Sequence, residues 1–482
     1  MNAPQYDAIV IGSGAGGAAT AYRLVQGGLK VMLLEKGDHL PVDGSTLDIQ
    51  RVVHEGKFLS REIWKDGRGR SLCPEEHFNV GGKTKWYGAA LLRFGAHEFQ
   101  ADCVHQCTRW PVSLADMEPF YQEAERLLGV RLFDTEPDLA DILCRLKAEW
   151  EVEPIPLSLA PRITADRLEA THFDGFASVA GLKGEADGSI LSLLRDHPNF
   201  TLSVNTEVRS LIGQTASPTT IAGVELADGR LIRAPHVFLA AGALHSPRIL
   251  GRYLESAGLD KILPIGAHIG RNVKLHLLTA MIALSGRSMT DLLRKTVVIT
   301  HEQFAHSSVQ PLGFDSELIA TLVPKVVPEY LRRQVGRRAY GFFLQTEDGS
   351  DPRNRVINAA NGVDHPVLDY DEDRTPNAAR EHKSFTRAFQ WALARAGLLT
   401  FTRRIGLNGT AHACGSLVCG ENASSSVVDR NGQVHGVAGL YVVDGSVLPR
   451  SSRVNPSLTI YAWGLRVADR VARQVAGGYR HA

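Results

Sequence analysis

A strand, a glycine-rich turn and a helix follow one another within the first 28 residues, and this unit constrains the fold more than any other feature. The apolar run 6–12 (YDAIVIG) leads into Gly12, Gly14 and Gly17, which match G-x-G-x-x-G, and a helical stretch (AATAYRLVQGG) follows. Gly12 allows the tight turn, Gly14 lets backbone approach a pyrophosphate, and Gly17 lets the helix pack closely on the strand. The N-terminus of the helix then offers N–H groups and partial positive charge to phosphates.

A second strand and an acidic residue complete this motif. The run 30–34 (KVMLL) ends at Glu35, where a carboxylate can bond the ribose of an adenine dinucleotide. The order strand, turn, helix, strand and acid predicts a bound ADP moiety. A reductase that draws on NAD(P)H through a flavin normally carries a second glycine fingerprint in mid-chain, and residues 266–270 lack its spacing. One tightly held FAD is therefore favoured.

Composition excludes several classes of protein. The 482 residues suit two or three domains and can bury a core without covalent cross-links. A formal net charge of +1 points neither to nucleic acid nor to an acidic membrane surface as a partner. No apolar run reaches the ~18 residues of a membrane-spanning helix, and the N-terminus lacks a signal-peptide pattern, so a cytoplasmic location is expected. The six cysteines are unevenly placed and predict reduced thiols.

Hydrophobic patterning predicts the other main elements. Strand-like alternation returns at 199–212, and a hairpin is expected to turn at Asp228-Gly229. An apolar strand, a small-residue turn and a helix are expected over 236–250. The run 439–444 (GLYVVD) predicts a buried strand, and 458–476 predicts a closing helix.

Five segments, in order, resemble the glucose–methanol–choline (GMC) family of FAD-dependent oxidoreductases, which act on alcohols. The resemblance covers nearly the whole chain and is strongest at its two ends. The segments are 12–17, 81–88 (GGKTKWYG), 240–247 (AAGALHSP), 270–276 (GRNVKLH) and 426–469.

The resemblance implies an α/β fold, with a Rossmann-like FAD-binding domain of the glutathione-reductase type. This domain is expected to be interleaved with an α+β substrate domain built on an antiparallel sheet. The expected FAD-binding parts are 1–40, 185–280 and 411–482, and the flavin-loop and substrate parts are 41–184 and 281–410.

The resemblance also implies which residues contact the cofactor. Segment 81–88 matches the family's flavin loop, and the strand at Glu207-Val208 matches its adenine contact. Asp444 is expected to bond the ribityl or pyrophosphate region. The residues implied to bind FAD are, in chain order, Gly12, Gly14, Gly17, Glu35, Gly82, Thr84, Gly88, Val208, Ala241, Asp444, Gly445 and Pro456.

Two stretches depart from the family pattern. The small-residue signature usually continues into Ser-Gly-x-Gly, but here the chain continues as Gly251-Arg252-Tyr253, which puts the expected conformation in question. Some members attach FAD covalently through a histidine of the flavin loop. The matching residue is Trp86, so a dissociable FAD is expected.

A histidine and an asparagine have the spacing of the family's catalytic pair. His412 is followed by Gly415, as in H-x-x-G, and Asn455 lies 43 residues after His412. Alcohol oxidation removes a hydroxyl proton and a carbon-bound hydride, and histidine is the natural base near neutral pH. The amide of Asn455 can donate to the developing alkoxide, while the flavin accepts the hydride.

The same segment admits rival chemistries. Cys414 and Cys419 have the C-x4-C spacing of a redox dithiol, but disulfide reductases carry theirs on the first helix after the dinucleotide fold, so buried inert thiols are favoured. A zinc site with His412 as a third ligand lacks a fourth, and the cysteine-rich run 103–107 lacks a partner pair. No metal is expected.

The substrate is indicated less clearly. Glu347 and Asp348 follow an apolar strand and could line a pocket for a polyhydroxylated or cationic substrate, although a solvated strand end is the simpler reading. We expect oxidation of a primary or secondary alcohol, with a sugar, polyol or amino sugar favoured over an aliphatic or aromatic alcohol. The expected electron acceptor is O2 or a quinone-like carrier. The alternatives are a redox-silent lyase of the same fold and a non-catalytic flavin-binding subunit.

Overall fold

A parallel sheet forms the centre of one half of the molecule. The computed structural model describes residues 5–358 and 365–479. Five strands have the order β18-β10-β1-β2-β6, and every pairing is parallel. Because both faces of such a sheet are covered, its strands are apolar runs, and β1 is buried at every position. The strands are β1 (Ala8–Ile11), β2 (Val31–Leu34), β6 (Phe200–Ser203), β10 (His236–Leu239) and β18 (Leu440–Val442).

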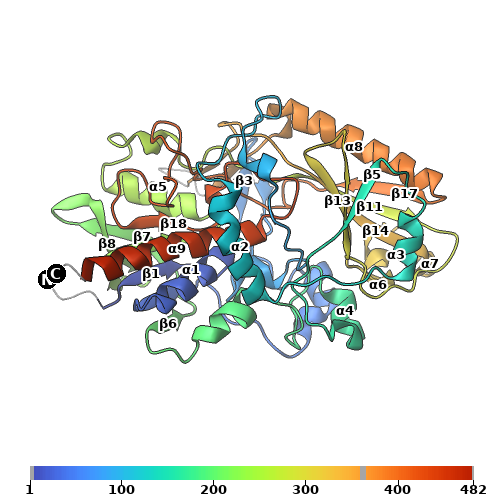
Figure 1. The fold of residues 1–482 in the computed structure, drawn as a ribbon, viewed down its shortest axis with the longest axis horizontal. Coiled ribbons are helices and arrows are strands. Elements are labelled where there is room, and N and C mark those ends of the chain that lie inside the picture. The colour runs from blue at the N-terminus through green and yellow to red at the C-terminus, as the bar shows by residue number, and fades with distance from the viewer. Residues whose placement is uncertain (1–4, 359–364, 480–482) are drawn as a thin grey trace.

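Helices from the two ends of the chain cover this sheet. α1 (Ala15–Gln26) packs along α9 (Ser457–Tyr479), and α2 (Leu114–Leu128) crosses α9 (Figure 1). The close approach depends on Gly464, because a Cβ there would lie 2.7 Å from the carbonyl oxygen of Gly16. The predicted closing helix is thus confirmed and runs three residues beyond its expected end, from 476 to 479.

A three-stranded antiparallel sheet and a helix lie beside the parallel sheet. Its strands are β7 (Val208–Gln214), β8 (Ser217–Leu226) and β9 (Leu231–Arg233). The hairpin between β8 and β9 turns at Gly229, whose φ of +86° favours glycine, as predicted. Residues 251–253, where the sequence departs from the family pattern, are helical, because they lie inside α5 (Ser246–Ser256).

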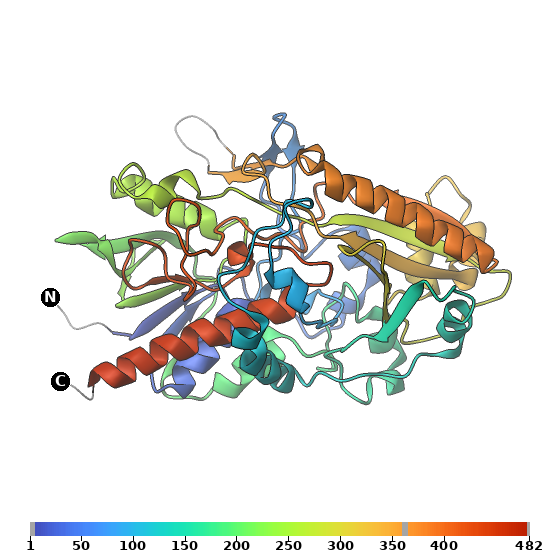
Figure 2. The ribbon, with the colours of Figure 1, turned by 45° about the horizontal axis from the view of Figure 1, so that its top comes forward.

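The other half of the molecule is built on a six-stranded antiparallel sheet, at the opposite end of the long axis (Figure 1). This confirms the expected fold class. The order β17-β11-β14-β13-β12-β5 contains β5 (Trp150–Pro154), β11 (Leu277–Leu284), β12 (Val297–His301), β13 (Ser307–Pro311), β14 (Ala339–Thr346) and β17 (Leu399–Arg404). α8 (Pro376–Arg395), orange in Figure 2, lies along the outside of this sheet and buries Phe385 and Phe389 against it.

Short elements connect the two halves. A four-stranded sheet of order β15-β16-β3-β4 contains β3 (Trp64–Asp66), β4 (Ser71–Leu72), β15 (Arg355–Ile357) and β16 (Val367–Asp369). The remaining α-helices of the described chain are α3 (Pro137–Leu143), α4 (Arg167–His172), α6 (Ser316–Leu322) and α7 (Glu329–Arg338). Within residues 5–358 and 365–479, no helix combines the length and apolar character needed to cross a membrane.

The division into two parts is less sharp than the sequence predicts. The boundary expected between 280 and 281 falls inside β11, and that whole strand pairs with β14. Phe94, Trp110 and Tyr121, expected in the substrate part, are buried in the same apolar core as the parallel sheet. Burial of their large side chains assigns these residues to that core, and patterns in a single sequence do not report such burial. The domain limits therefore remain a prediction.

Candidate active site

A cavity of about 510 Å³ extends from the N-terminal glycine turn to His412 and Asn455. This volume lies within the range of small-molecule and cofactor sites, roughly 300–1,000 Å³. The structure brings the residues expected at FAD to its wall from six separate stretches of chain. Those that line the cavity are Gly12, Gly14, Glu35, Gly82, Thr84, Gly88, Val208, Ala241, Asp444, Gly445 and Pro456. Gly17 is the one member of the predicted set outside the lining.

The glycines of the first turn have distinct uses. A Cβ at Gly17 would lie 1.9 Å from the carbonyl oxygen of Gly12, and one at Gly16 would lie 1.7 Å from that of Val443, so both let backbone segments meet. A Cβ at Gly14 would meet no protein atom within 4 Å. Gly14 is also the N-cap of α1 and lines the cavity, so the open space beside it suits a pyrophosphate at the helix N-terminus.

Glu35 ties the turn to the second strand. Its Oε2 accepts hydrogen bonds from the backbone N–H (3.1 Å) and hydroxyl (2.5 Å) of Ser13, and its Oε1 accepts one from Gly37 N–H at 2.9 Å. The carboxylate is therefore fixed at the cavity wall at the end of β2, in the place expected for a ribose contact. Together with the open space beside Gly14, this arrangement fits the ADP part of FAD.

The structure predicts a clean effect of Gly14→Ala. Gly14 has φ −67° and ψ −167°, which alanine can adopt, so the folded protein should tolerate the change. The methyl group would instead occupy space in the cavity, and we expect the FAD dissociation constant to rise at least tenfold, about 1.4 kcal/mol. A titration of apoprotein by flavin fluorescence measures this.

Gly16→Ala is the matched contrast, because its methyl group would collide with the Val443 carbonyl, and it should lower the thermal unfolding midpoint of the apoprotein. Unchanged FAD affinity in Gly14→Ala would contradict the placement of the pyrophosphate.

Asp444 joins two turns at the cavity wall. Its Oδ2 accepts from Gly242 N–H (2.8 Å) and the Ser246 hydroxyl (2.5 Å), and its Oδ1 accepts from Ser446 N–H (2.9 Å). Both carboxylate oxygens are thus engaged by protein donors, which positions the small-residue turn next to Gly445. A direct bond from Asp444 to FAD remains a prediction.

His412 and Asn455 meet at the other end of the cavity, although 43 residues separate them. Nδ2 of Asn455 lies 3.4 Å from Nε2 of His412. The Nε2 amide group of Gln310, on β13, donates to Oδ1 of Asn455 at 2.5 Å. Gln310 therefore turns the amide of Asn455 so that its N–H group faces His412 and the cavity.

The electrostatic surroundings keep His412 neutral. Burial lowers the pKa of His412 well below its ordinary value, and the positive charges of Lys295 and Lys83 lower that pKa further. The ring consequently carries no charge near neutral pH and has a lone pair available for a proton. A neutral imidazole beside an amide donor can accept the proton of a substrate hydroxyl.

An ion pair lines the same end of the cavity. Nζ of Lys295 lies 3.0 Å from Oδ2 of Asp174, which also accepts from Gly313 N–H at 3.0 Å. The pair presses against Gly88, where a Cβ would lie 2.3 Å from Asp174 Oδ1 and 2.4 Å from Lys295 Nζ. Nothing in the sequence singled out Asp174, Lys295 or Gln310, because none belongs to a recognisable motif. His276 was expected only as part of the family-like segment 270–276, with no role of its own.

The carboxylates that the sequence offered for substrate binding have a different place. Glu347 and Asp348 are buried, at 0% and 1% exposure, and neither lines the cavity. The expectation that these carboxylates line a substrate pocket is therefore wrong, and so is the alternative of a solvated strand end. Glu347 pairs with the guanidinium of Arg450, and Asp348 accepts from Leu275 N–H at 2.9 Å and the Tyr370 hydroxyl at 2.9 Å.

Cys414 and Cys419 are buried and unpaired, and neither lines the cavity. Burial raises the pKa of the Cys414 thiol to about 12 and raises that of Cys419 as well, so neither is a thiolate near neutral pH. Of these three side chains, His412 is the one that lines the cavity.

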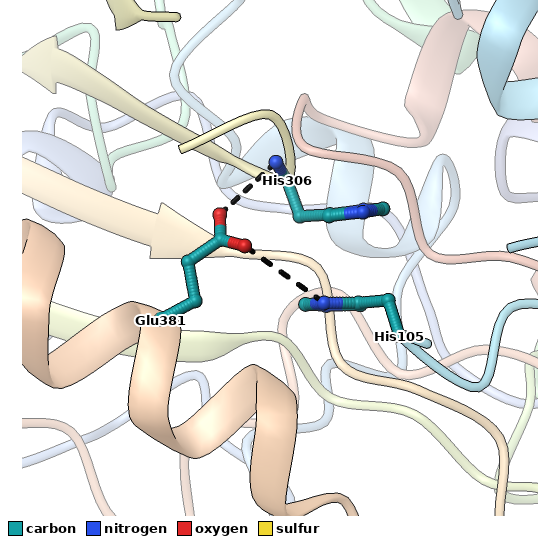
Figure 3. A group of neighbouring side chains, drawn as sticks. All are labelled: His105, His306 and Glu381. Atoms are coloured by element: carbon teal, nitrogen blue, oxygen red, sulfur yellow. Dashed lines mark hydrogen bonds and ion pairs between the residues drawn. The ribbon is translucent and has the colours of Figure 1, made fainter. Parts of the chain in front are cut away.

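Potential metal ligands gather outside the cavity. Among the described residues the groups are His105, His306 and Glu381 (Figure 3), and Cys107, His306 and Glu347. The two imidazole rings are stacked, with centroids 3.7 Å apart and planes inclined by 8°. Their nitrogen lone pairs lie in parallel planes and cannot converge on one ion at the ~2.1 Å of a metal–nitrogen bond.

His306 is instead part of an ion network that joins the buried Arg450 and Glu347 through His306 to Asp102, whose side chain is 37% exposed. Its Nδ1 lies 2.9 Å from Glu347 and its Nε2 lies 3.0 Å from Asp102, so each nitrogen donates to a carboxylate. Burial alone would lower the pKa of His306, but the hydrogen bond to Glu347 and the negative charges of Glu347 and Glu381 together outweigh burial and raise that pKa. Burial likewise opposes ionisation of Glu347, yet Arg450 and His306 hold the pKa of this carboxyl far below its usual range.

Comparisons with known proteins agree on the class. A family model described as FAD dependent oxidoreductase matches residues 7–271, and one described as GMC oxidoreductase matches residues 350–464. Paromamine 6'-oxidase of Streptomyces fradiae is 28% identical, over 97% of this chain and 91% of that protein. 6'''-Hydroxyparomomycin C oxidase of Streptomyces lividus is 28% identical, over 98% of this chain and 92% of that protein.

Solved structures share the fold. Pyridoxine 4-oxidase from Mesorbium loti superposes with a TM-score of 0.60 and 18% sequence identity, and the match covers 99% of each chain. At this identity the likeness concerns the fold alone.

Proposed function

The chain belongs to the GMC family of FAD-dependent oxidoreductases, and we propose that it oxidises an alcohol carbon of a sugar, polyol or amino sugar with His412 as the base. FAD-dependent oxidation of a CH–OH group follows from the family. The observation that carries the residue-level proposal is the neutral ring of His412 at the cavity wall, with the amide N–H of Asn455 beside its Nε2.

The side chains divide the work of the reaction. FAD, when bound, supplies the acceptor for the hydride that leaves the substrate carbon. Nε2 of His412 takes the hydroxyl proton, so that loss of one proton and one hydride converts the alcohol to an aldehyde or ketone. The N–H group of Asn455 donates to the substrate oxygen as negative charge develops there. Gln310 holds that amide in place.

The buried surroundings of His412 favour proton transfer to its ring. The same desolvation that keeps His412 neutral makes its interactions with a developing charge stronger than they would be in water. The ammonium group of Lys295 adds positive charge near the reacting oxygen, and its bond to Asp174 keeps it in position. We further propose that FAD is held without a covalent bond, because Trp86 occupies the position where some members carry a linking histidine.

The lining favours a polyhydroxylated substrate. Asp174 and Lys295 offer a carboxylate and an ammonium group to hydroxyl or amino groups, and Leu312 and Phe343 offer apolar surface to the C–H faces of a ring. The two relatives at 28% identity are named as oxidases of paromamine and of 6'''-hydroxyparomomycin C, both aminoglycosides. An amino sugar would satisfy the carboxylate of Asp174 with its ammonium group.

Asp174→Asn tests this substrate class. Loss of a hydrogen bond to a charged group costs about 1.5–3 kcal/mol, so KM for an amino sugar should rise roughly 10- to 100-fold, with a smaller change in kcat. A simple aliphatic alcohol should show no comparable rise in KM, whereas the loss of kcat that follows from releasing Lys295 should be shared by both substrates. Steady-state kinetics with both substrates provide the measurement.

Asp228→Asn, at an exposed turn, is the control for removal of a carboxylate, and it should leave both substrates unaffected. An unchanged KM for every amino sugar and sugar in Asp174→Asn would exclude Asp174 from recognition.

Product analysis tests the function itself. FAD-loaded protein is incubated with sugars, amino sugars, polyols and simple alcohols, once with O2 and once with a quinone dye as acceptor. Formation of an aldehyde or ketone from a sugar-type substrate supports the proposal, and the acceptor that sustains turnover decides between oxidase and dehydrogenase. Absence of any oxidised product with either acceptor would favour the redox-silent alternatives.

A further inference from the structure

We propose that His276 is a positioning residue that fixes the ring tautomer of His412, so that Nε2 of His412 keeps its lone pair toward the cavity. His276 precedes β11 directly and is 4% exposed. The inference rests on the proposed role of His412 as the base.

The first hydrogen bond shows which ring nitrogen of His276 carries the hydrogen. Its Nε2 lies 2.7 Å from the carbonyl oxygen of Ser452. A carbonyl oxygen only accepts hydrogen bonds, so Nε2 must carry the hydrogen. A neutral imidazole has one N–H group, and Nδ1 of His276 is therefore an acceptor.

The second hydrogen bond shows which ring nitrogen of His412 carries the hydrogen. Nδ1 of His276 and Nδ1 of His412 are 3.1 Å apart, and the two rings are nearly perpendicular, at 83°. Because Nδ1 of His276 is an acceptor, Nδ1 of His412 must donate. The single hydrogen of a neutral His412 is then on Nδ1, and its Nε2, the atom next to Asn455, is free to take a proton.

The opposite tautomer is disfavoured by the same contacts. With its hydrogen on Nε2, His412 would point the lone pair of Nδ1 at the lone pair of His276 Nδ1, 3.1 Å away. Two facing acceptors repel each other, and a buried acceptor left without a donor is destabilising. Such a ring would also present an N–H group to the substrate hydroxyl, where a base is required.

The backbone that holds this chain of bonds is strained and strongly supported. His276 has φ +63° and Ser452 has φ +70°, a left-handed region that is unfavourable for a non-glycine residue. Ser452 N–H donates to Glu347 Oε1 at 3.1 Å, and its hydroxyl donates to Glu98 Oε1 at 2.5 Å. The ion network around Arg450 and Glu347 therefore anchors the carbonyl from which the order of hydrogen bonds begins.

Two variants of His276 separate positioning from packing. His276→Leu has similar bulk but no acceptor for His412, and it should slow anaerobic flavin reduction by alcohol roughly 10- to 100-fold, as is usual when a supporting hydrogen bond is lost. His276→Gln keeps an amide oxygen to accept from His412 and an amide N–H group to donate to Ser452. It should restore most of the rate, and substrate affinity should change little in either variant.

His382→Leu is the matched control, because His382 is 5% exposed and bonds Thr279 and Thr346 away from the cavity. It removes a buried histidine but should leave the rate of flavin reduction as in the wild type. Equal rates in the wild type and His276→Leu would overturn the inference, and so would a loss in His276→Gln as large as in His276→Leu.

A spectroscopic measurement on the wild type avoids any folding defect of a variant. In ¹⁵N-histidine-labelled protein, protonated and unprotonated ring nitrogens resonate separately, and the His412 signals are those missing from His412→Ala. We expect a protonated Nδ1 and an unprotonated Nε2, and the reverse would overturn the inference. Because this spectrum needs no substrate, it remains informative if no alcohol reduces the flavin, a result that would count against the proposed function instead.

Discussion

His412→Ala is expected to bind FAD as the wild type does but to reduce it on the order of 10²- to 10⁴-fold more slowly when mixed with substrate. The alanine leaves the glycine turn and Glu35 untouched, so the ADP end of the cavity keeps its form. The base that takes the hydroxyl proton is missing, and hydride transfer from an un-ionised alcohol has a far higher barrier. Stopped-flow absorbance under anaerobic conditions measures the rate.

His435→Ala is a suitable control for this variant. His435 is partly exposed, bonds the Ser426 hydroxyl at 3.1 Å and lies outside the cavity lining. Its removal should leave the reduction rate unchanged. Reduction of the His412→Ala flavin at a near wild-type rate would show that another group accepts the proton.

Glu347→Gln should destabilise the fold by about 3–5 kcal/mol, the range for breaking one partner of a buried ion pair. The side chains of Glu347 and Arg450 are 0% and 1% exposed, so the guanidinium would be left buried without its counter-charge. His306 would lose the same carboxylate. Urea unfolding at neutral pH gives the free energy of unfolding.

The pH dependence of this difference follows from two opposite shifts. Glu347 has a lowered pKa in the fold, so its contribution is complete above about pH 4.3, the unfolded value, and is lost as the pH falls. His306 has a raised pKa, so its contribution is complete below about pH 6.5 and is lost as the pH rises through its folded pKa. The destabilisation should therefore be largest between about pH 4.3 and 6.5 and smaller on either side.

Glu329→Gln provides the exposed counterpart. Glu329 pairs with Arg333 one helical turn later, and their side chains are 64% and 70% exposed. Such pairs contribute little because solvent screens them, so the free energy of unfolding should hardly change. An equally small effect in Glu347→Gln would contradict the structural role assigned to the buried network.

The fold could be predicted largely from local chemistry and from a family resemblance. The turn at 12–17 carries a recognisable spacing of glycines, although the backbone that Gly12 and Gly16 meet, at residues 240 and 443, lies far along the chain. The hairpin at Gly229 and the apolar strand 439–444 are also local signals. The pairing of β18 with β10 is not local and was not predicted, because the resemblance assigned both segments to the FAD-binding part without pairing their strands. The limits of the two domains remain a prediction, and the places of β11 and of Phe94, Trp110 and Tyr121 depend on packing that local patterns do not report.

The residues of the candidate site likewise divide into those that a motif predicts and those that only the fold brings together. His412 and Asn455 carry a motif and a spacing, and the structure brings them together. Gln310, Asp174, Lys295 and the role of His276 depend on strands and loops of the substrate half folding over the cavity. No pattern in one sequence reports such contacts. Glu347 illustrates the converse, because its position after an apolar strand suggested a substrate contact or a solvated end, whereas burial beside Arg450 gives it a structural role.

Anaerobic mixing of the FAD-loaded protein with a panel of sugars, amino sugars and alcohols is the decisive measurement for alcohol oxidation at this site. We expect a sugar-type alcohol to bleach the flavin spectrum, with a rate that falls when the carbinol hydrogen is replaced by deuterium. An oxidised spectrum that stays unchanged with every alcohol and sugar in the panel would contradict alcohol oxidation at this site.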